Sequence, residues 1–307
     1  MLYKKLHLFS FCTISTHSHL FKAFALADSI APFKGVLSIL IIDKDGDLEE
    51  KPENATIFYL SDLKDNIGIR LIDKYKNNKD KLRWALKPVF LKYLLKEFNA
   101  VVYVDNDIYF YNNPKILFDL LDTNSILLTP HFYDSNPNKN QNWLEANFKV
   151  GLYNAGFIGV STNANKALQW WSECCLYNIK KSYWRGLFDD QKYLDLVPIL
   201  FDDVMVLKHK GLNLAGWNYL FYKLDRKENN IVEVEHKYPL IFIHFAETSM
   251  IHFAKSDNFF NPEYLTYTAT LLKYNSAFIN KRNYLKSYTL SVYINFIKWK
   301  ISRLLEG

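Results

Sequence analysis

The sequence predicts a mixed α/β fold in which a mostly parallel β-sheet carries helices on both faces. Short runs of Val, Ile and Leu alternate along the chain with stretches of helical periodicity, which is the pattern of strand–helix–strand units. Hydrophobic residues make up 49% of the 307 residues and aromatic residues 17%, and no Pro/Gly/Ser-rich linker divides the chain. One compact unit is therefore expected, rather than a disordered chain or a string of separate domains.

The first half of the chain supplies the elements of this sheet. The expected order is a strand over residues 6–14, a polar turn over 15–18, a helix over about 20–30, a strand over 36–42 and a further strand over 57–60. The run over 36–42 is nearly continuous in β-branched residues and Leu, as in a strand buried on both faces, and Asp43 ends it. Ligands bind beyond the carboxyl ends of the strands in such sheets, so Asp43 and the polar turn are expected along one edge.

A later apolar run ends in Asp105-Asn106-Asp107. Two carboxylates two residues apart, at the end of a buried strand, can direct oxygen atoms toward one hard divalent cation. The same residue types are also ordinary after a strand, because Asp and Asn favour turns. Upstream of this strand, Pro88 is placed to begin a helix. Lys87 at the helix entrance is positioned either to meet a phosphate or to cap a solvated helix end.

Basic residues concentrate near the end of the chain, although the net charge of +6 is modest. Residues 280–307 contain six Lys or Arg and one acidic residue, and their apolar residues recur at helical spacing, which predicts a basic amphipathic C-terminal helix. We expect a folded domain over 1–270 and a tail over 271–307 that either attaches to an anionic membrane surface or packs on its own domain. Nucleic-acid binding is not expected, since these cations do not lie along an aromatic platform.

Cysteine usage favours a reducing compartment. Cys12, Cys174 and Cys175 are an odd set with an adjacent pair, which suits neither a disulfide framework nor a zinc site. Polar residues interrupt the apolar N-terminal stretch, so we expect no secretory signal, and no apolar run of the sequence approaches the length of a membrane span. These observations predict a cytoplasmic protein.

Several short motifs occur in the order seen in glycosyltransferases of the Rossmann-like GT-A fold. They are the first strand with its polar turn, Ala85-Leu86-Lys87-Pro88, Tyr103-Val104-Asp105-Asn106-Asp107-Ile108, Tyr153-Asn154-Ala155-Gly156-Phe157, Asp190-Gln191 and Ile243-His244-Phe245. The chain resembles in particular the retaining group that includes glycogenin and bacterial lipooligosaccharide galactosyltransferases. This resemblance covers roughly residues 6–252 and rests on the order of the motifs rather than on any single one.

The resemblance implies a site for Mn²⁺ or Mg²⁺ and a nucleotide-sugar donor, with a UDP-sugar as the expected donor. In the resembling group a histidine from a late strand completes the metal set, which makes His244 the partner of Asp105 and Asp107. The alternative is a histidine satisfied within the core. The group usually continues with Gly and later Lys-Pro-Trp, whereas Ala246-Glu247-Thr248 follow here, and His252 is a second candidate ligand.

The resemblance also implies residues for the transferred sugar and for the nucleotide. Asp190, Gln191 and Asn154 are the expected catalytic residues, because an acidic side chain near the sugar can bind hydroxyls and favour an oxocarbenium-like centre. Alternatively, Asp190 caps a helix and Asn154 lies in an ordinary turn. The expected nucleotide- and metal-binding residues are Thr13, Ser15, Asp43, Lys87, Asp105 and Asn106.

The expected function is therefore a metal-dependent, retaining hexosyltransferase that acts on a hydroxyl of a glycan or glycolipid. Surface polysaccharide or lipopolysaccharide synthesis on the inner face of the cytoplasmic membrane is the implied setting. A phosphatase is disfavoured because no Thr follows the Asp-x-Asp pair, and a nucleotidyltransferase because residues 15–20 contain no glycine. The alternative is a degenerate protein of this fold that binds nucleotide, glycan or membrane without turnover.

Overall fold

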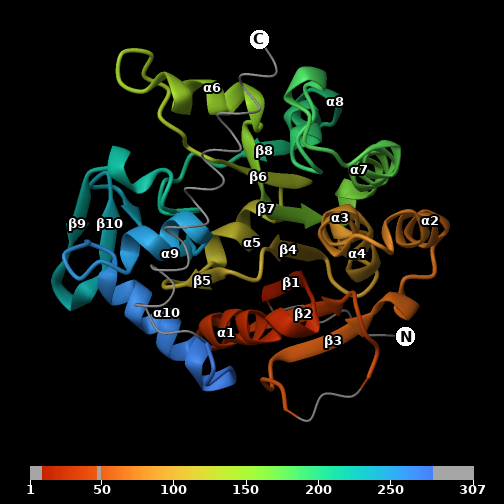
Figure 1. Ribbon diagram of the computed structural model, residues 1–307, viewed down its shortest axis with the longest axis horizontal. Coiled ribbons are helices and arrows are strands. Elements are labelled where there is room, and N and C mark those ends of the chain that lie inside the picture. Colours follow the sequence, from red (N-terminus) through yellow and green to blue (C-terminus); the bar gives the residue numbers. More distant parts are fainter. Residues whose placement is uncertain (1–8, 47–49, 279–307) are drawn as a thin grey trace.

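A seven-stranded sheet forms the centre of the computed structural model, which describes residues 9–46 and 50–278 (Figure 1). The strands lie in the order β3-β2-β1-β4-β7-β6-β8. Their bounds are β1 Phe9–Ser15, β2 Gly35–Ile41, β3 Ala55–Tyr59, β4 Ala100–Val104, β6 Ile126–Pro130, β7 Tyr153–Ser161 and β8 Val204–Val206.

The sheet is mostly parallel, as predicted. The pairs β1–β2, β2–β3, β1–β4 and β6–β8 are parallel. Only β7 runs the other way among these strands, antiparallel to both β4 and β6. Its direction is important for the site, because it brings the start of β7 beside the end of β4.

Helices cover both faces of the sheet (Figure 1). One face packs against α1 (Leu20–Ile30) and α5 (Lys115–Leu121), and the other against α2 (Asn66–Tyr75), α3 (Lys79–Ala85), α4 (Lys87–Leu94) and α7 (Asn165–Tyr177). Successive side chains of a strand point to opposite faces. Accordingly Phe11 packs on the α1 side, whereas its neighbour Cys12 and then Ile14 pack on the α4 side.

A smaller layer lies beside the α1 face. Its parts are β5 (Ile108–Phe110) with β12 (Phe242–His244), the sheet of β9 (Leu224–Arg226), β10 (Val232–Val234) and β11 (Tyr238–Pro239), and the helices α9 (Glu247–Phe253) and α10 (Asn261–Tyr274). The rings of Phe24 on α1 and Tyr274 on α10 lie 5.3 Å apart, which joins this layer to the main domain. Two short helices, α6 (Gln141–Lys149) and α8 (Val197–Leu200), complete the outer edge.

The sequence placed the helix over 20–30 correctly, and the strand expected over 36–42 is shifted by one residue. Asn154 and Gly156 lie inside strand β7 and not in a turn. Helix α10 continues through residue 270 to Tyr274, and the C-terminal helix expected over 280–307 lies outside the described residues.

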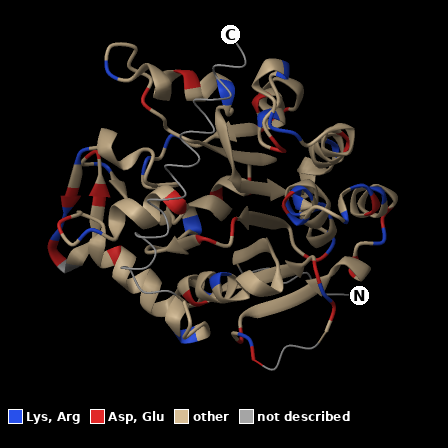
Figure 2. Ribbon diagram, in the orientation of Figure 1, with Lys and Arg blue, Asp and Glu red and all other residues tan. Residues whose placement is uncertain are grey.

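All three cysteines are free thiols, with Cys12 and Cys175 buried. Among the described residues, no helix is both long and apolar enough to span a bilayer. Figure 2 shows acidic and basic residues interspersed over helices and loops of the described chain in this view.

Candidate active site

Backbone pairing brings three separate segments together at the carboxyl end of β4. Asp105 follows β4 directly, and its N–H donates to the carbonyl oxygen of Gly156 on β7 at 2.9 Å. The antiparallel pairing of β12 with β5 places His244 opposite Ile108, and the N–H of Phe245 donates to the carbonyl of Asp107 at 2.7 Å. The register of these two pairings therefore sets the distance between the carboxylates and the histidine.

Asp105, Asp107 and His244 form a compact group whose ligand atoms all lie within 4.8 Å of one another. Nε2 of His244 is 3.1 Å from Oδ1 of Asp107, and the Tyr103 hydroxyl donates to Oδ1 of Asp105 at 2.8 Å. Burial acts to lower the pKa of His244, but the Asp107 carboxylate outweighs it, so the pKa of His244 is raised. Burial acts to raise the pKa of Asp107, yet the facing His244 ring holds it well below its usual range.

Gly156 packs directly against this group. A Cβ at this position would lie 2.8 Å from Oδ2 of Asp105 and 2.8 Å from Cε1 of His244. Two carboxylates and an imidazole suit Mn²⁺ and Mg²⁺, which bind mainly oxygen, and Mn²⁺ also accepts imidazole nitrogen. The donor set therefore fits a divalent cation, and the absence of a side chain at position 156 lets Asp105 and His244 converge.

Asn154 holds the His244 ring in place. Its Nδ2 lies 3.2 Å from Nδ1 of His244 and donates to Oδ1 of Asn213 at 2.9 Å, while its Oδ1 accepts from the N–H of Gly156 at 2.8 Å. All of these groups are buried. Outer partners of this kind orient metal-binding histidines in proteins. The structure thus gives Asn154 a positioning contact to the candidate ligand.

His252 lies outside this group. It is half-buried on α9, where its ring contacts Tyr219 at 5.8 Å. The pairing of β12 with β5 decides between the two histidines, and it places His244 at the carboxylates.

Lys87 and Asp190 form a buried ion pair next to the carboxylates. Nζ of Lys87 is 3.1 Å from Oδ2 of Asp190 and 3.8 Å from Oδ1 of Asp105, and it donates to the carbonyl of Ala155 at 2.9 Å. Lys87 is only 2% exposed, so it neither caps a solvated helix end nor stands free for a phosphate. Burial raises the pKa of Asp190 to about 6, against the opposing effect of the Lys87 ammonium.

Gln191 ties this pair to the backbone of two neighbouring segments. Its Oε1 accepts from the N–H of Ala155 at 3.1 Å, and its Nε2 donates to the carbonyl of Val150 at 3.1 Å. Gln191 also precedes the 3₁₀ helix over Lys192–Leu196 as its N-cap residue, without a side-chain capping bond. Its side chain therefore serves the site rather than the helix end.

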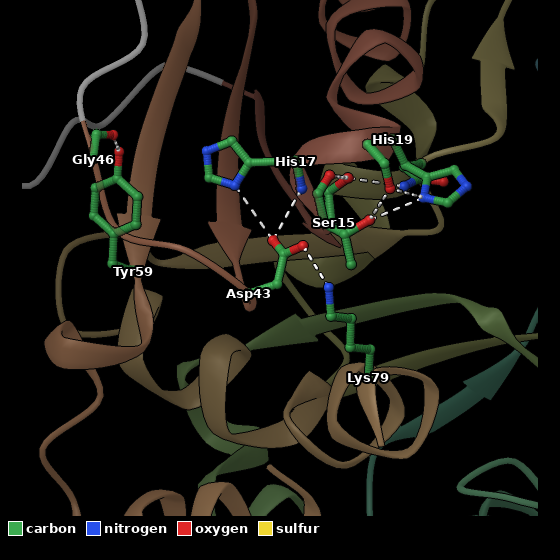
Figure 3. Close-up of polar contacts among 10 residues, drawn as sticks. Ser15, His17, His19, Asp43, Gly46, Tyr59 and Lys79 are labelled. Atoms are coloured by element: carbon green, nitrogen blue, oxygen red, sulfur yellow. Dashed lines mark hydrogen bonds and ion pairs between the residues drawn. The ribbon is translucent and has the colours of Figure 1, made fainter. Parts of the chain in front are cut away.

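Of the residues expected at the nucleotide, Ser15 ends β1 and Asp43 follows the end of β2, whereas Thr13 lies within β1. Ser15 is fully buried and its Oγ accepts from Nδ2 of Asn106 at 3.2 Å, which links the end of β1 to the Asp105–Asp107 loop. Thr13 is also fully buried, inside the sheet. Asp43 accepts from the backbone N–H of His17 at 3.0 Å and from Nζ of Lys79 at 3.0 Å (Figure 3). Asp43 thus holds the β1 turn and the start of α3 together.

Two residues near the carboxylates were not predicted from the sequence. The Arg83 guanidinium is partly exposed, pairs with Asp80 at 3.3 Å and interacts electrostatically with Asp105 and Asp107; burial acts to lower the pKa of Arg83, but these carboxylates raise it. Its place four residues before Lys87 was the available signal, because that spacing puts two cations on one side of a helical segment. Trp217, which resembles an acceptor-side aromatic residue of the transferases but was given no catalytic role, makes an edge-to-face contact with His244, with the ring centroids 5.3 Å apart.

A second carboxylate–histidine group lies on the small sheet. Asp225, Glu233 and His236 offer ligand atoms within 4.8 Å of one another. Lys227 already contacts Glu233 at 3.2 Å and Asp225 at 3.9 Å. Its carboxylates are thus already paired with a lysine and its histidine is exposed, whereas His244 of the first group is buried.

This sheet order and the polar edge around β4 define the GT-A fold, and comparison with a solved structure agrees. An active-site mutant of LgtC superposes with a TM-score of 0.52 at 12% identity, over 85% of this chain and 95% of that one. At this identity the likeness establishes the fold alone.

Sequence comparison places the chain more narrowly. It belongs to the family of YfnF, an uncharacterized protein of Bacillus subtilis (strain 168), with 30% identity over 253 residues, 77% of this chain and 80% of YfnF. YfnD of the same organism, also uncharacterized, is 28% identical over 257 residues, 79% of each chain. No family model matches the sequence.

Proposed function

We propose that this protein is a metal-dependent glycosyltransferase, which moves a sugar from a nucleoside diphosphate to a hydroxyl of a glycan or glycolipid. The observation that carries the proposal is the group formed by the half-buried carboxylates of Asp105 and Asp107 and the buried His244 beside Gly156, at the strand edge where a GT-A fold binds its donor. The transferred group we propose is a hexose, as the resemblance of the sequence motifs to lipooligosaccharide galactosyltransferases implies.

Asp105, Asp107 and His244 would hold Mn²⁺ or Mg²⁺. When bound there, the cation supplies positive charge to neutralise the negative charge that develops on the departing diphosphate. Arg83 adds a permanent cation on the same side, because its guanidinium already interacts with both aspartates. A UDP-sugar is the donor we propose, with the nucleotide beside Ser15 and Asp43.

Asp190 is the residue we propose for the donor sugar. With a pKa of about 6 it is mostly ionised at neutral pH, and Lys87 holds its carboxylate in a single orientation. A buried carboxylate of this kind can accept hydrogen bonds from sugar hydroxyls and stabilise positive charge at the anomeric carbon. We propose retention of the anomeric configuration, with the acceptor proton passing to an oxygen of the leaving phosphate.

The setting we propose is the inner face of the cytoplasmic membrane, in surface polysaccharide or lipopolysaccharide synthesis. The basic, aromatic sequence over 280–307 supports membrane attachment, since such segments are attracted to anionic lipid.

One observation favours a second candidate, a protein of this fold that binds its ligands without turnover. After His244 the chain enters helix α9 at Glu247, where the resembling transferases carry Gly and then Lys-Pro-Trp. An acidic residue there is unfavourable for a diphosphate.

Two measurements separate these candidates. The first is the thermal stability of the protein with UDP and UDP-sugars, with and without Mn²⁺, because a ligand that binds only the folded state raises stability. The second is Mn²⁺-dependent hydrolysis of the UDP-sugar without acceptor. We expect a Mn²⁺-dependent shift and hydrolysis, both lost in Asp107→Ala. A shift without hydrolysis would establish the binding-only alternative, and hydrolysis that survives in Asp107→Ala would refute the proposed site.

A further inference from the structure

A small β-hairpin projects from the chain immediately before Asp189 and Asp190. Ser182 and Leu187 exchange backbone hydrogen bonds of 2.9 and 3.0 Å, and the N–H of Asp189 donates to the carbonyl of Lys180 at 3.3 Å. The four-residue tip, residues 183–186, turns through a 3₁₀ segment and closes on Gly186, whose φ of 62° is left-handed. The hairpin over residues 180–189 is therefore hydrogen-bonded along its length.

The tip presents aromatic side chains to solvent. Trp184 is 98% exposed and Tyr183 60%, and Tyr177 at the end of α7 is 65% exposed. Arg185 donates to the Tyr177 hydroxyl at 3.0 Å, so Tyr177 belongs to the same surface. Because the Trp184 ring buries almost no surface in the free protein, it contributes little to the stability of the fold. Large apolar side chains exposed in this way mark interaction surfaces.

Further apolar side chains are exposed on the segment that follows. Leu196, Ile199 and Leu200 are all exposed, at and after the 3₁₀ helix that begins at Lys192. The rings of Trp170 on α7 and Phe201 after α8 contact each other at 5.7 Å, so the two helices lie together at one corner of the fold (Figure 1). The exposed apolar groups therefore come from neighbouring elements.

The hairpin carries three basic residues and one acidic residue. Lys180 and Arg185 have no carboxylate partner among the described residues, and Lys181 pairs with Asp189 at the hairpin base at 3.3 Å. Trp and Tyr prefer the boundary between lipid headgroups and acyl chains, while Lys and Arg are attracted to anionic headgroups. Exposed aromatic tips beside unpaired cations thus match an anionic bilayer better than a neutral protein surface.

We propose that this hairpin, residues 180–189, is a membrane-docking element that places Tyr183 and Trp184 at the interface of an anionic bilayer. Because the hairpin continues directly into Asp190, docking holds the active site close to the lipid surface. The acceptor is then a lipid-linked glycan presented by that bilayer, an inference that rests on the proposed transferase function.

Vesicle binding by the full-length protein tests the proposal without any turnover. The vesicles are phosphatidylcholine with and without phosphatidylglycerol, and the variants are Trp184→Ala and Arg185→Gln. We expect Trp184→Ala to weaken binding to the anionic vesicles on the order of tenfold. Arg185→Gln should weaken it roughly fivefold, with less effect at high salt. The matched controls, Leu220→Ala and Arg70→Gln, alter exposed residues elsewhere and should bind as the unaltered protein does.

Brominated lipid separates the hairpin from the C-terminal segment, which also carries a Trp. The comparison uses Trp299→Phe and the double variant Trp299→Phe/Trp184→Phe, so the difference between their fluorescence is the emission of Trp184. Anionic vesicles that contain brominated acyl chains should quench this emission. Equal quenching of the two proteins would overturn the proposal. The proposal would also be overturned if the protein self-associates and Trp184→Ala makes it monomeric, because Trp184 would then lie in an interface between copies of the chain.

Different experimental results would refute the proposed function and the docking role. UDP-sugar hydrolysis without vesicles should be unchanged in Trp184→Ala, because Trp184 lies outside the candidate site. Loss of that hydrolysis would make Trp184 part of the site and refute docking as its role. If the protein binds vesicles normally but does not hydrolyse UDP-sugars, the docking role is retained and the proposed transferase function is refuted.

Discussion

Replacement of Gly156 by Ala tests the site with one methyl group. The new Cβ would lie 2.8 Å from Oδ2 of Asp105, 2.8 Å from Cε1 of His244 and 2.9 Å from Oδ1 of Asn154. Real Cβ contacts are longer than this, so at least one of these side chains must move. Asp105 and His244 belong to the candidate metal group, and Asn154 orients His244. We therefore expect the substitution to weaken metal binding more than it lowers the free energy of unfolding.

The expected magnitudes differ for the two properties. Loss of one outer orienting partner weakens metal binding about 10- to 100-fold, and displacement of a ligand should reach the upper end, about 2.7 kcal/mol. For folding, overpacking costs about 1–3 kcal/mol, and the lower entropy of the unfolded Ala chain offsets about 0.4–1 kcal/mol. The net loss in the free energy of unfolding is thus between about 0 and 2.6 kcal/mol, small enough to leave a folded protein for the assay.

Gly159→Ala is the matched control, because Gly159 lies in the same strand and the three atoms nearest its Cβ would all belong to the Leu127 side chain, at 3.2–3.3 Å. Calorimetric titration with Mn²⁺ gives the affinity, and urea unfolding gives the stability. We expect Gly159→Ala to lose stability but keep Mn²⁺ affinity. Equal Mn²⁺ affinity in Gly156→Ala and the unaltered protein, with both folded, would refute the site as drawn.

Two further predictions use the same protein. His244→Ala should weaken Mn²⁺ binding far more than His252→Ala, since only His244 faces the carboxylates; calorimetry in which His252→Ala had the larger effect would reverse the ligand assignment. The pKa of Asp190 is about 6 in the folded protein, above its ordinary 3.8, so between these values the folded state binds more protons than the unfolded state. The free energy of unfolding should therefore fall as the pH rises from about 4 to 6, by on the order of 3 kcal/mol. Urea unfolding across this range should show a flatter profile for Asp190→Asn, and an unchanged slope would contradict the buried, raised pKa.

The sequence by itself determined the local elements and the position of the carboxylates. The helix over 20–30 and the strand near 36–42 were predictable because periodicity and β-branched runs are properties of neighbouring residues. The same holds for Asp105 and Asp107, because the end of an apolar run marks the end of a buried strand. The mostly parallel sheet followed from the alternation of strands and helices.

Only the tertiary structure decided which distant residues meet. The antiparallel direction of β7 places Asn154 and Gly156 in a strand beside Asp105, where the sequence allowed a turn. The register of β12 on β5 selects His244, and the packing of α4 buries Lys87 against Asp190. Pairing direction, register and burial depend on contacts between segments far apart in the chain, and local periodicity carries no information about them.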